Sequence, residues 1–79
     1  MVSRTIASLK KGTKAKITRI NHGAGCFRAK LLSMGLTPGA RIHVKHVAPL
    51  GDPFQIETRG TLLSLRKQEA RCIEVDLSS

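Results

Sequence analysis

The sequence predicts a mostly β fold in which five short strands form a small, strongly bent barrel, with one α-helix inserted after the first strand. Several stretches alternate apolar and polar side chains, which is the period of a half-buried strand. Tight turns rich in glycine and proline separate these stretches. A flat sheet of such short strands would leave two unpaired edges, so closure into a barrel is favoured. We expect the 79 residues to form a single domain, near the lower size limit for one hydrophobic core.

The N-terminal part predicts a short helical turn followed by the first strand. Ile6 and Leu9 have helical spacing, which indicates a turn near residues 5–9 that Gly12 would end. A frayed, basic terminus is an equally good interpretation of this segment. Ala15 then begins an alternation with lysines, which predicts a first strand ending near Ile20.

The inserted helix is expected at about residues 25–34. Phe27, Leu31 and Met34 follow one another at the spacing of a single helix face. The next residue, Gly35, is well placed to end the helix in the left-handed conformation. The following leucine would then fold back onto the last helical turn.

The second and third strands are expected to form a hairpin around residues 47–54. Proline fixes φ and lacks an N–H, so neither Pro49 nor Pro53 can lie inside a central strand. Asp52 can hydrogen-bond to nearby backbone. The turn is therefore expected to set the register of the hairpin and to hold Leu50 in a rigid, protruding position.

Three further elements complete the predicted fold. They are a third strand at residues 54–59 with a short fourth strand after it, a polar helical turn near residues 67–70, and a last strand at residues 71–77. In the fourth strand, Leu63 and Leu65 are expected to face the core while Leu62 points outward. In the last strand, the alternation places Cys72 on the outer face.

The charge balance points to an acidic partner. Fourteen Lys and Arg residues against five Asp and Glu give a net charge of +9. Aromatic residues make up only 3% of the chain, whereas proteins that bind single-stranded nucleic acid stack bases on exposed aromatic rings. The sequence contains no apolar run long enough to span a bilayer and no signal-peptide pattern, so we expect a cytoplasmic protein with its two cysteines reduced.

The residue pattern favours neither a metal site nor catalysis. His22 and Cys26 could supply at most two ligands from one loop, and a zinc or iron site needs three or four that converge. His43 and His46 are three residues apart, which on a regular strand sends them to opposite faces. No combination of nucleophile and base can be placed together from the sequence. We therefore expect no catalytic residue, no cofactor and no metal.

Three segments resemble the FeoA family in the same order and with the same gaps. Residues 31–40 (LLSMGLTPGA) resemble the helix end and turn of that family, and residues 49–53 (PLGDP) resemble its hairpin turn. Residues 63–66 (LSLR), followed by Glu69 and Ala70, resemble its last motif. The chain departs from the family pattern at two positions: Lys30 stands where an arginine is common, and Leu62 stands where a polar residue is common.

The resemblance implies an SH3-like barrel with an inserted helix and a small cytoplasmic accessory of FeoB, the ferrous-iron transporter with a GTP-binding domain. Members of the family are thought to act by binding FeoB rather than by catalysis. The same module occurs at the C-terminus of iron-dependent repressors, but this chain has no helix-turn-helix region.

We expect the partner to contact exposed apolar and polar side chains of the helix end and of the turns. These candidate contacts are Leu31, Met34, Leu50, Asp52, Leu62 and Arg66. Arg66 or Arg28 could act as an arginine finger toward a GTPase, although a solvated surface charge is the simpler interpretation. The basic residues of the first half could steer the protein toward an acidic protein surface or the inner leaflet of the membrane, through a weak contact with an anionic surface.

The function predicted from the sequence is that of a non-enzymatic accessory of ferrous-iron uptake that binds and modulates FeoB and is recruited to the inner face of the membrane. The alternative is a basic small-barrel protein that binds nucleic acid; the charge favours it, and the scarcity of aromatic residues opposes it. A third hypothesis, a chaperone that delivers Fe²⁺, depends on His22 and Cys26 alone.

Overall fold

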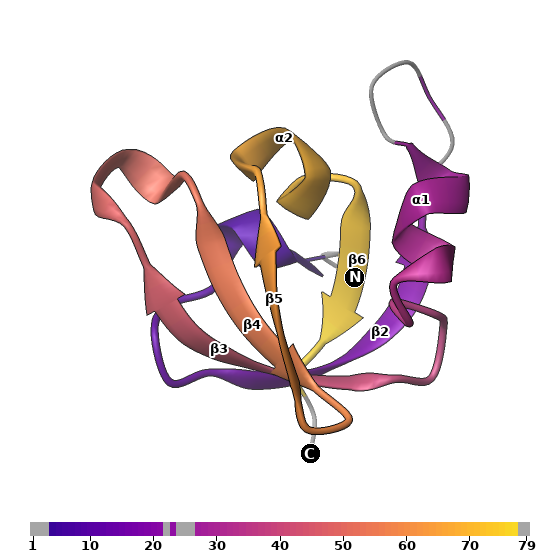
Figure 1. The fold of residues 1–79 in the computed structure, drawn as a ribbon, viewed down its shortest axis with the longest axis horizontal. Coiled ribbons are helices and arrows are strands. Elements are labelled where there is room, and N and C mark those ends of the chain that lie inside the picture. The colour runs from indigo at the N-terminus through magenta and orange to yellow at the C-terminus, as the bar shows by residue number, and fades with distance from the viewer. Residues whose placement is uncertain (1–3, 22, 24–26, 78–79) are drawn as a thin grey trace.

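The computed structural model describes residues 4–21, 23 and 27–77, whose strands form one strongly bent antiparallel sheet (Figure 1). The sheet order is β1–β6–β2–β3–β4–β5. The strands are β1 (Arg4–Thr5), β2 (Lys14–Ile20), β3 (Arg41–Val47), β4 (Phe54–Thr58), β5 (Thr61–Leu65) and β6 (Ile73–Asp76). The helices are η1 (Ile6–Ser8), α1 (Arg28–Ser33), η2 (Pro49–Gly51) and α2 (Lys67–Ala70), where η denotes a 3₁₀-helix. The mostly β fold with one inserted helix is confirmed.

The described part of the chain contains six strands, so the expected number of five is wrong. The additional strand is β1, in which Arg4 pairs with Val75 and Thr5 pairs with Glu74 of β6. A strand of two residues is too short to produce a visible alternation of apolar and polar side chains. The helical turns expected near residues 5–9 and 67–70 are confirmed as η1 and α2.

The two outer strands of the sheet, β1 and β5, are brought together by short helices. α2 follows β5, contacts it, and also contacts η1, which follows β1 (Figure 1). Ile6 of η1 and Ala70 of α2 are both fully buried. The barrel is thus closed at this end by side-chain packing rather than by a further ladder of hydrogen bonds.

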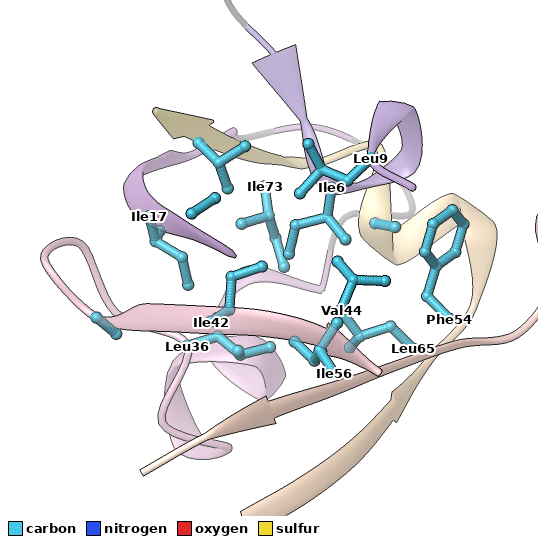
Figure 2. Packing of buried hydrophobic residues seen from close by; sticks show 14 of the residues in the cluster. Ile6, Leu9, Ile17, Leu36, Ile42, Val44, Phe54, Ile56, Leu65 and Ile73 are labelled. Carbon is cyan, nitrogen blue, oxygen red and sulfur yellow. The ribbon is translucent and has the colours of Figure 1, made fainter. Parts of the chain in front are cut away.

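The core lies inside the curved sheet and draws side chains from most strands (Figure 2). Its largest fully buried members include Phe54, Ile17, Leu31 and Ile73. In β5, Leu65 is buried and Leu62 is 58% exposed, as the alternation predicts. Burial of apolar surface contributes roughly 25 cal/mol per Å² and is the main stabilising term for so small a domain.

Two β-bulges change which residues face the core. One lies between Ile17 and Arg19, so Ile17 and Ile20 are both buried although their spacing is odd. The other lies between Val44 and His46. As a result, His43 and His46 pair with Glu57 and Gln55, which are two residues apart on β4 and therefore share a face. The expectation that the two histidines point to opposite faces is wrong.

The inserted helix α1 is shorter than the expected residues 25–34. Of that range, residues 25 and 26 lie outside the described part of the chain. Phe27 precedes the helix with φ of +50° and is 57% exposed, so it does not belong to the buried helix face. The predicted end of the helix is confirmed, because Gly35 has a positive φ and Leu36 N–H donates to the Leu31 carbonyl.

The last strand, β6, is also shorter than the expected residues 71–77. Cys72 precedes it and is buried, whereas the alternation placed it on the outer face. Its backbone is held on both sides: its N–H donates to the Glu69 carbonyl, and its carbonyl accepts from Asn21 N–H. Cys72 is disulfide-bonded, so the expectation of a reduced thiol is wrong for this residue.

Candidate functional site

The hairpin between β3 and β4 carries the most exposed large apolar side chain in the described part of the chain. Leu50 lies in η2, is 93% exposed and has φ of +71°. Pro49 begins this turn, and the Asp52–Pro53 peptide bond that follows it is cis. The Ala48 N–H donates to the Pro53 carbonyl at 3.2 Å and closes the loop. The turn thus presents an isolated leucine to solvent.

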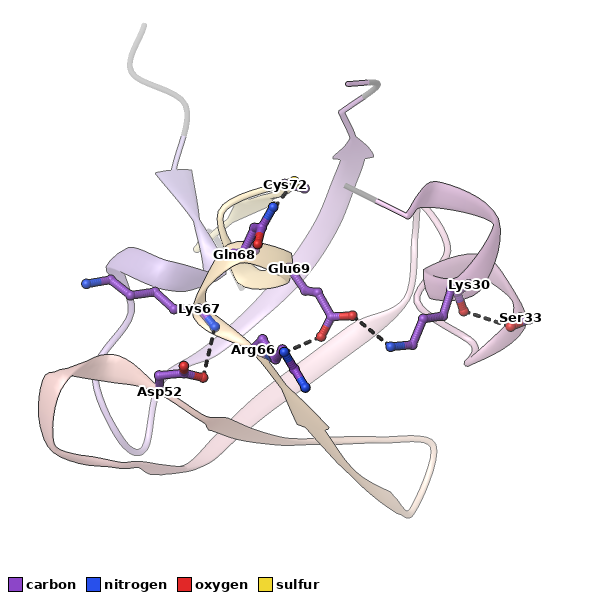
Figure 3. Close-up of polar contacts among 8 residues, drawn as sticks. All are labelled: Lys30, Ser33, Asp52, Arg66, Lys67, Gln68, Glu69 and Cys72. Carbon is purple, nitrogen blue, oxygen red and sulfur yellow. Dashed lines mark hydrogen bonds and ion pairs between the residues drawn. The ribbon is translucent and has the colours of Figure 1, made fainter. Parts of the chain in front are cut away.

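The hairpin tip is attached to α2 through Asp52. Its Oδ1 accepts a hydrogen bond from the Lys67 backbone N–H at 3.3 Å (Figure 3). The two residues are 15 positions apart in sequence, and Asp52 is exposed. This bond connects the tip of one hairpin to the first residue of the next helix.

The two α-helices are joined by Glu69, which is buried. Its Oε1 accepts from the Arg66 backbone N–H at 2.9 Å, and its Oε2 lies 3.0 Å from the Lys30 Nζ of α1 (Figure 3). The Glu69 side chain is 5% exposed, whereas the Lys30 side chain is 60% exposed. Glu69 follows Arg66 by three residues, the spacing at which a glutamate accepts from the N-cap N–H.

Glu69 is ionised in this setting. Burial alone would raise the pKa of its carboxyl group. The hydrogen bonds from the Arg66 N–H and the Lys30 ammonium group, together with the charges of Lys30 and Arg66, outweigh the effect of burial and lower the pKa below 4.5. The carboxylate therefore stabilises the arrangement of α1 and α2 at neutral pH.

Three of the predicted contact residues lie near one another. Leu50 and Asp52 belong to the hairpin tip, and Arg66 directly precedes Lys67, to which Asp52 is bonded. We refer to Leu50, Asp52 and Arg66 as the turn–helix surface. Asp52 and Arg66 are exposed, as Leu50 is.

The other three predicted contact residues lie elsewhere. Leu31 is fully buried, so its side chain offers no surface to a partner and the prediction for this residue is wrong. Met34 is half-buried and packs against the core. Leu62 is exposed but pairs with Glu57 near the far end of β4, away from the hairpin tip that precedes Phe54.

Sequence reasoning missed the part played by Lys30 and Glu69. The spacing of Arg66 and Glu69 is a signal that a sequence can carry. The ion pair with Lys30 spans 39 positions, and no local pattern could have indicated it.

The described residues contain no group of three or more His, Cys, Asp or Glu side chains that could hold a metal ion. His22 and Cys26, on which the metal-chaperone hypothesis depends, lie outside the described part of the chain. Within residues 4–21, 23 and 27–77, no helix is long and apolar enough to cross a bilayer.

A family profile and a curated relative both indicate the FeoA domain family. The FeoA domain profile matches residues 4–77. A curated relative, the Fe(2+) transport protein A/Fe(2+) transporter FeoB fusion protein of Porphyromonas gingivalis, is 39% identical over 74 residues, which cover 94% of this chain. This chain corresponds to only 9% of the length of that relative.

Solved structures of similar proteins have the same fold. An FeoA-like protein from Clostridium acetobutylicum is 32% identical, with a TM-score of 0.87 over 100% of this chain and 91% of that one. An FeoA from Stenotrophomonas maltophilia, described as a prokaryotic SH3 domain protein, is 24% identical, with a TM-score of 0.82 over 96% of this chain and 93% of that one. The fold of the present chain is accordingly SH3-like.

Proposed function

Since this chain belongs to the FeoA domain family, we propose that it is a non-enzymatic accessory of ferrous-iron transport that binds the membrane transporter FeoB and modulates it. The protein would act on the cytoplasmic side, recruited to the inner face of the membrane by FeoB itself. Its contribution would come from protein–protein contacts rather than from chemistry of its own.

The observation that carries this proposal is the relative in which the two proteins are one chain. In the P. gingivalis fusion protein, a segment 39% identical to this chain is covalently joined to FeoB. Fusion raises the effective concentration of one partner near the other, which is useful when the two parts act together. Separate chains must achieve the same association through a binding surface.

The turn–helix surface is the part of the described chain that best fits such a contact. Leu50 is almost fully exposed in a short turn closed by a backbone hydrogen bond. The Asp52 bond to Lys67 holds this turn against α2, so little conformational entropy would be lost on docking. An exposed leucine that enters a partner pocket contributes about 1.5–3 kcal/mol of binding free energy.

Titration of the protein into purified full-length FeoB at near-physiological salt tests the proposal. We expect saturable binding, and we expect Leu50→Ala to weaken it about tenfold or more, because 1.4 kcal/mol corresponds to a factor of ten. Leu62→Ala is the matched control: the same side chain is removed from the far end of the β4–β5 hairpin, where we expect little change.

The possible outcomes distinguish a wrong binding surface from a wrong function. Normal binding of the Leu50→Ala variant would refute the turn–helix surface while leaving FeoB as the partner. The accessory function would be refuted if the wild-type protein did not bind FeoB but bound duplex DNA. In that case the logarithm of the DNA-binding constant should fall linearly with log[salt], which would favour nucleic-acid binding.

A further inference from the structure

A cavity of about 360 Å³ opens on the surface where β2, β3 and the β4–β5 turn meet. It lies apart from the turn–helix surface, since no residue of that surface lines it. Its charged and titratable lining residues are Lys14, Lys16, Arg41, His43, Glu57 and Arg59. Ala15 and Ile42 contribute the apolar part of the lining. We refer to this cavity as the basic pocket.

Strand register brings the lining residues of the basic pocket together from three regions of the chain. Lys14 pairs with His43 and Lys16 pairs with Arg41 across β2 and β3. Beyond the last β3–β4 pair, the buried Thr58 hydroxyl donates to the Arg41 carbonyl at 2.9 Å. This bond holds the start of β3 against the end of β4. It therefore also fixes the position of the Arg41 backbone relative to the turn that carries Arg59.

Among the described residues, the positive charge of the basic pocket is balanced only in part. Among the described residues, none of its four Lys and Arg side chains forms an ion pair. The acid in the lining, Glu57, is paired with Lys45 outside the pocket, at 3.5 Å. Asp76 is the cross-strand neighbour of Lys16 on β6 but does not line the pocket. Four Lys and Arg residues therefore line the recess together with a single carboxylate, which is already paired with Lys45.

Arg59 supplies a second, independent observation. It forms the two-residue β4–β5 turn with Gly60, and both residues have positive φ, +53° and +79°. Such a turn favours asparagine before glycine, because a longer L side chain is strained in the left-handed region. An arginine at this position carries a conformational cost, and Arg59 is one of the residues that line the pocket. Backbone strain of this kind is characteristic of functional positions.

We propose that the basic pocket binds a small anion that carries phosphate, either a free phosphate ester such as a nucleotide or the headgroup of a phospholipid. Its volume is at the lower end of the range for small-molecule sites. Arginine guanidinium groups match phosphate geometry, and lysines add point charges. The lining contains no Phe, Tyr or Trp side chain on which nucleic-acid bases could stack.

The test is an NMR titration of the ¹⁵N-labelled protein with inorganic pyrophosphate, a nucleoside triphosphate and vesicles with or without anionic phospholipid. Saturable shifts at Ala15, Ile42 and Gly60, with one-to-one stoichiometry by calorimetry, are expected with at least one phosphate compound. Binding to the soluble compounds identifies a free ester, and a response confined to anionic vesicles identifies a headgroup. Either result supports the proposal.

Arg59→Asn is the decisive variant. Asparagine tolerates the left-handed conformation, so Tm should be unchanged or higher by up to about 5 °C, while affinity falls about tenfold. Arg71→Asn is the charge-matched control on the exposed end of α2 and should bind like the wild type. Shifts spread over the whole basic surface, equal losses in both variants, or tight binding only to duplex DNA would overturn the proposal. The proposal that the protein binds FeoB would stand even if the phosphate proposal failed.

Discussion

At the scale of single residues, Glu69 links two helices that are far apart in sequence. One carboxylate oxygen accepts from the Arg66 N–H, and the other pairs with Lys30. The carboxylate is buried, whereas the lysine is mostly solvated. Removing the acid therefore leaves a backbone donor without its acceptor, which costs more than the loss of an exposed ion pair.

Glu69→Ala is expected to lower the free energy of unfolding by about 2 kcal/mol at neutral pH, because hydrogen bonds to charged groups contribute roughly 1.5–3 kcal/mol. Glu69→Gln keeps an acceptor for the Arg66 N–H and should lose less. Urea denaturation followed by circular dichroism measures both. Equal losses in the two variants would contradict the assigned role of the hydrogen bond.

The contribution of Glu69 also predicts a pH dependence. Its pKa in the folded state lies below 4.5, so the unfolded chain takes up a proton first as the pH falls. The stabilisation is complete above pH 4.5 and is lost as the pH falls from there through the folded-state pKa. The stability difference between wild type and Glu69→Gln should narrow in this window, and a constant difference would disprove the linkage.

At the scale of secondary-structure elements, α1 ends because of Gly35. Its φ is +92°, its N–H donates to the Leu32 carbonyl, and Leu36 N–H donates to Leu31. Leu31 and Leu36 are both fully buried, so the end of the helix and the core are formed by the same residues. An ideal Cβ built on Gly35 meets no atom within 4 Å, so space is not the constraint.

Gly35→Ala is expected to destabilise the protein by about 1 kcal/mol, through the left-handed conformation alone. For a domain of this size the corresponding fall in Tm is roughly 4–8 °C. Gly35→Asn should recover part of the loss, because asparagine tolerates positive φ better. Calorimetry of the wild type and the two variants measures these Tm values. An alanine variant as stable as the wild type would refute the argument.

The secondary structure shows where sequence patterns succeed and where they fail. Period-two alternation predicted β2 to β6, and the glycine and proline positions predicted the turns. Alternation could not reveal the bulges beside Arg19 and His46, because a bulge changes the facing of later residues without a sequence signal of its own. Phe27 fits the helical spacing, but its backbone is left-handed, and spacing alone carries no information on that.

At the scale of the whole molecule, closure of the barrel depends on η1. Ile6 is fully buried where the β1 end of the sheet meets α2. A domain of this size has a total stability of only about 5–15 kcal/mol. Loss of packing at this junction should therefore affect the entire fold.

Ile6→Ala is expected to lower the free energy of unfolding by about 3 kcal/mol, since it leaves a cavity in the core. Leu50→Ala, which removes an exposed side chain, should change it by less than about 0.5 kcal/mol. Hydrogen exchange provides a second measurement: protection should fall in β2 and β3 as well as in β1. A loss of protection confined to β1 would show that the terminus frays independently.

The candidate sites are whole-molecule properties, and the sequence predicted them less well than the fold. The exposed position of Leu50 could be predicted, because two flanking prolines make a short turn recognisable. The basic pocket could not, because Lys14, Arg41 and Arg59 come from separate strands and turns that only the register brings together. Viewed one at a time, each of these residues is an ordinary solvated charge.

The pairing of β1 with β6 places the two ends of the described fold side by side. Arg4 lies opposite Val75, so the chain enters and leaves the barrel at neighbouring positions. A short linker could join these positions, which makes the fold a suitable subject for circular permutation. The same geometry lets such a module be inserted into a loop of a larger protein without separating the segments on either side of the insertion.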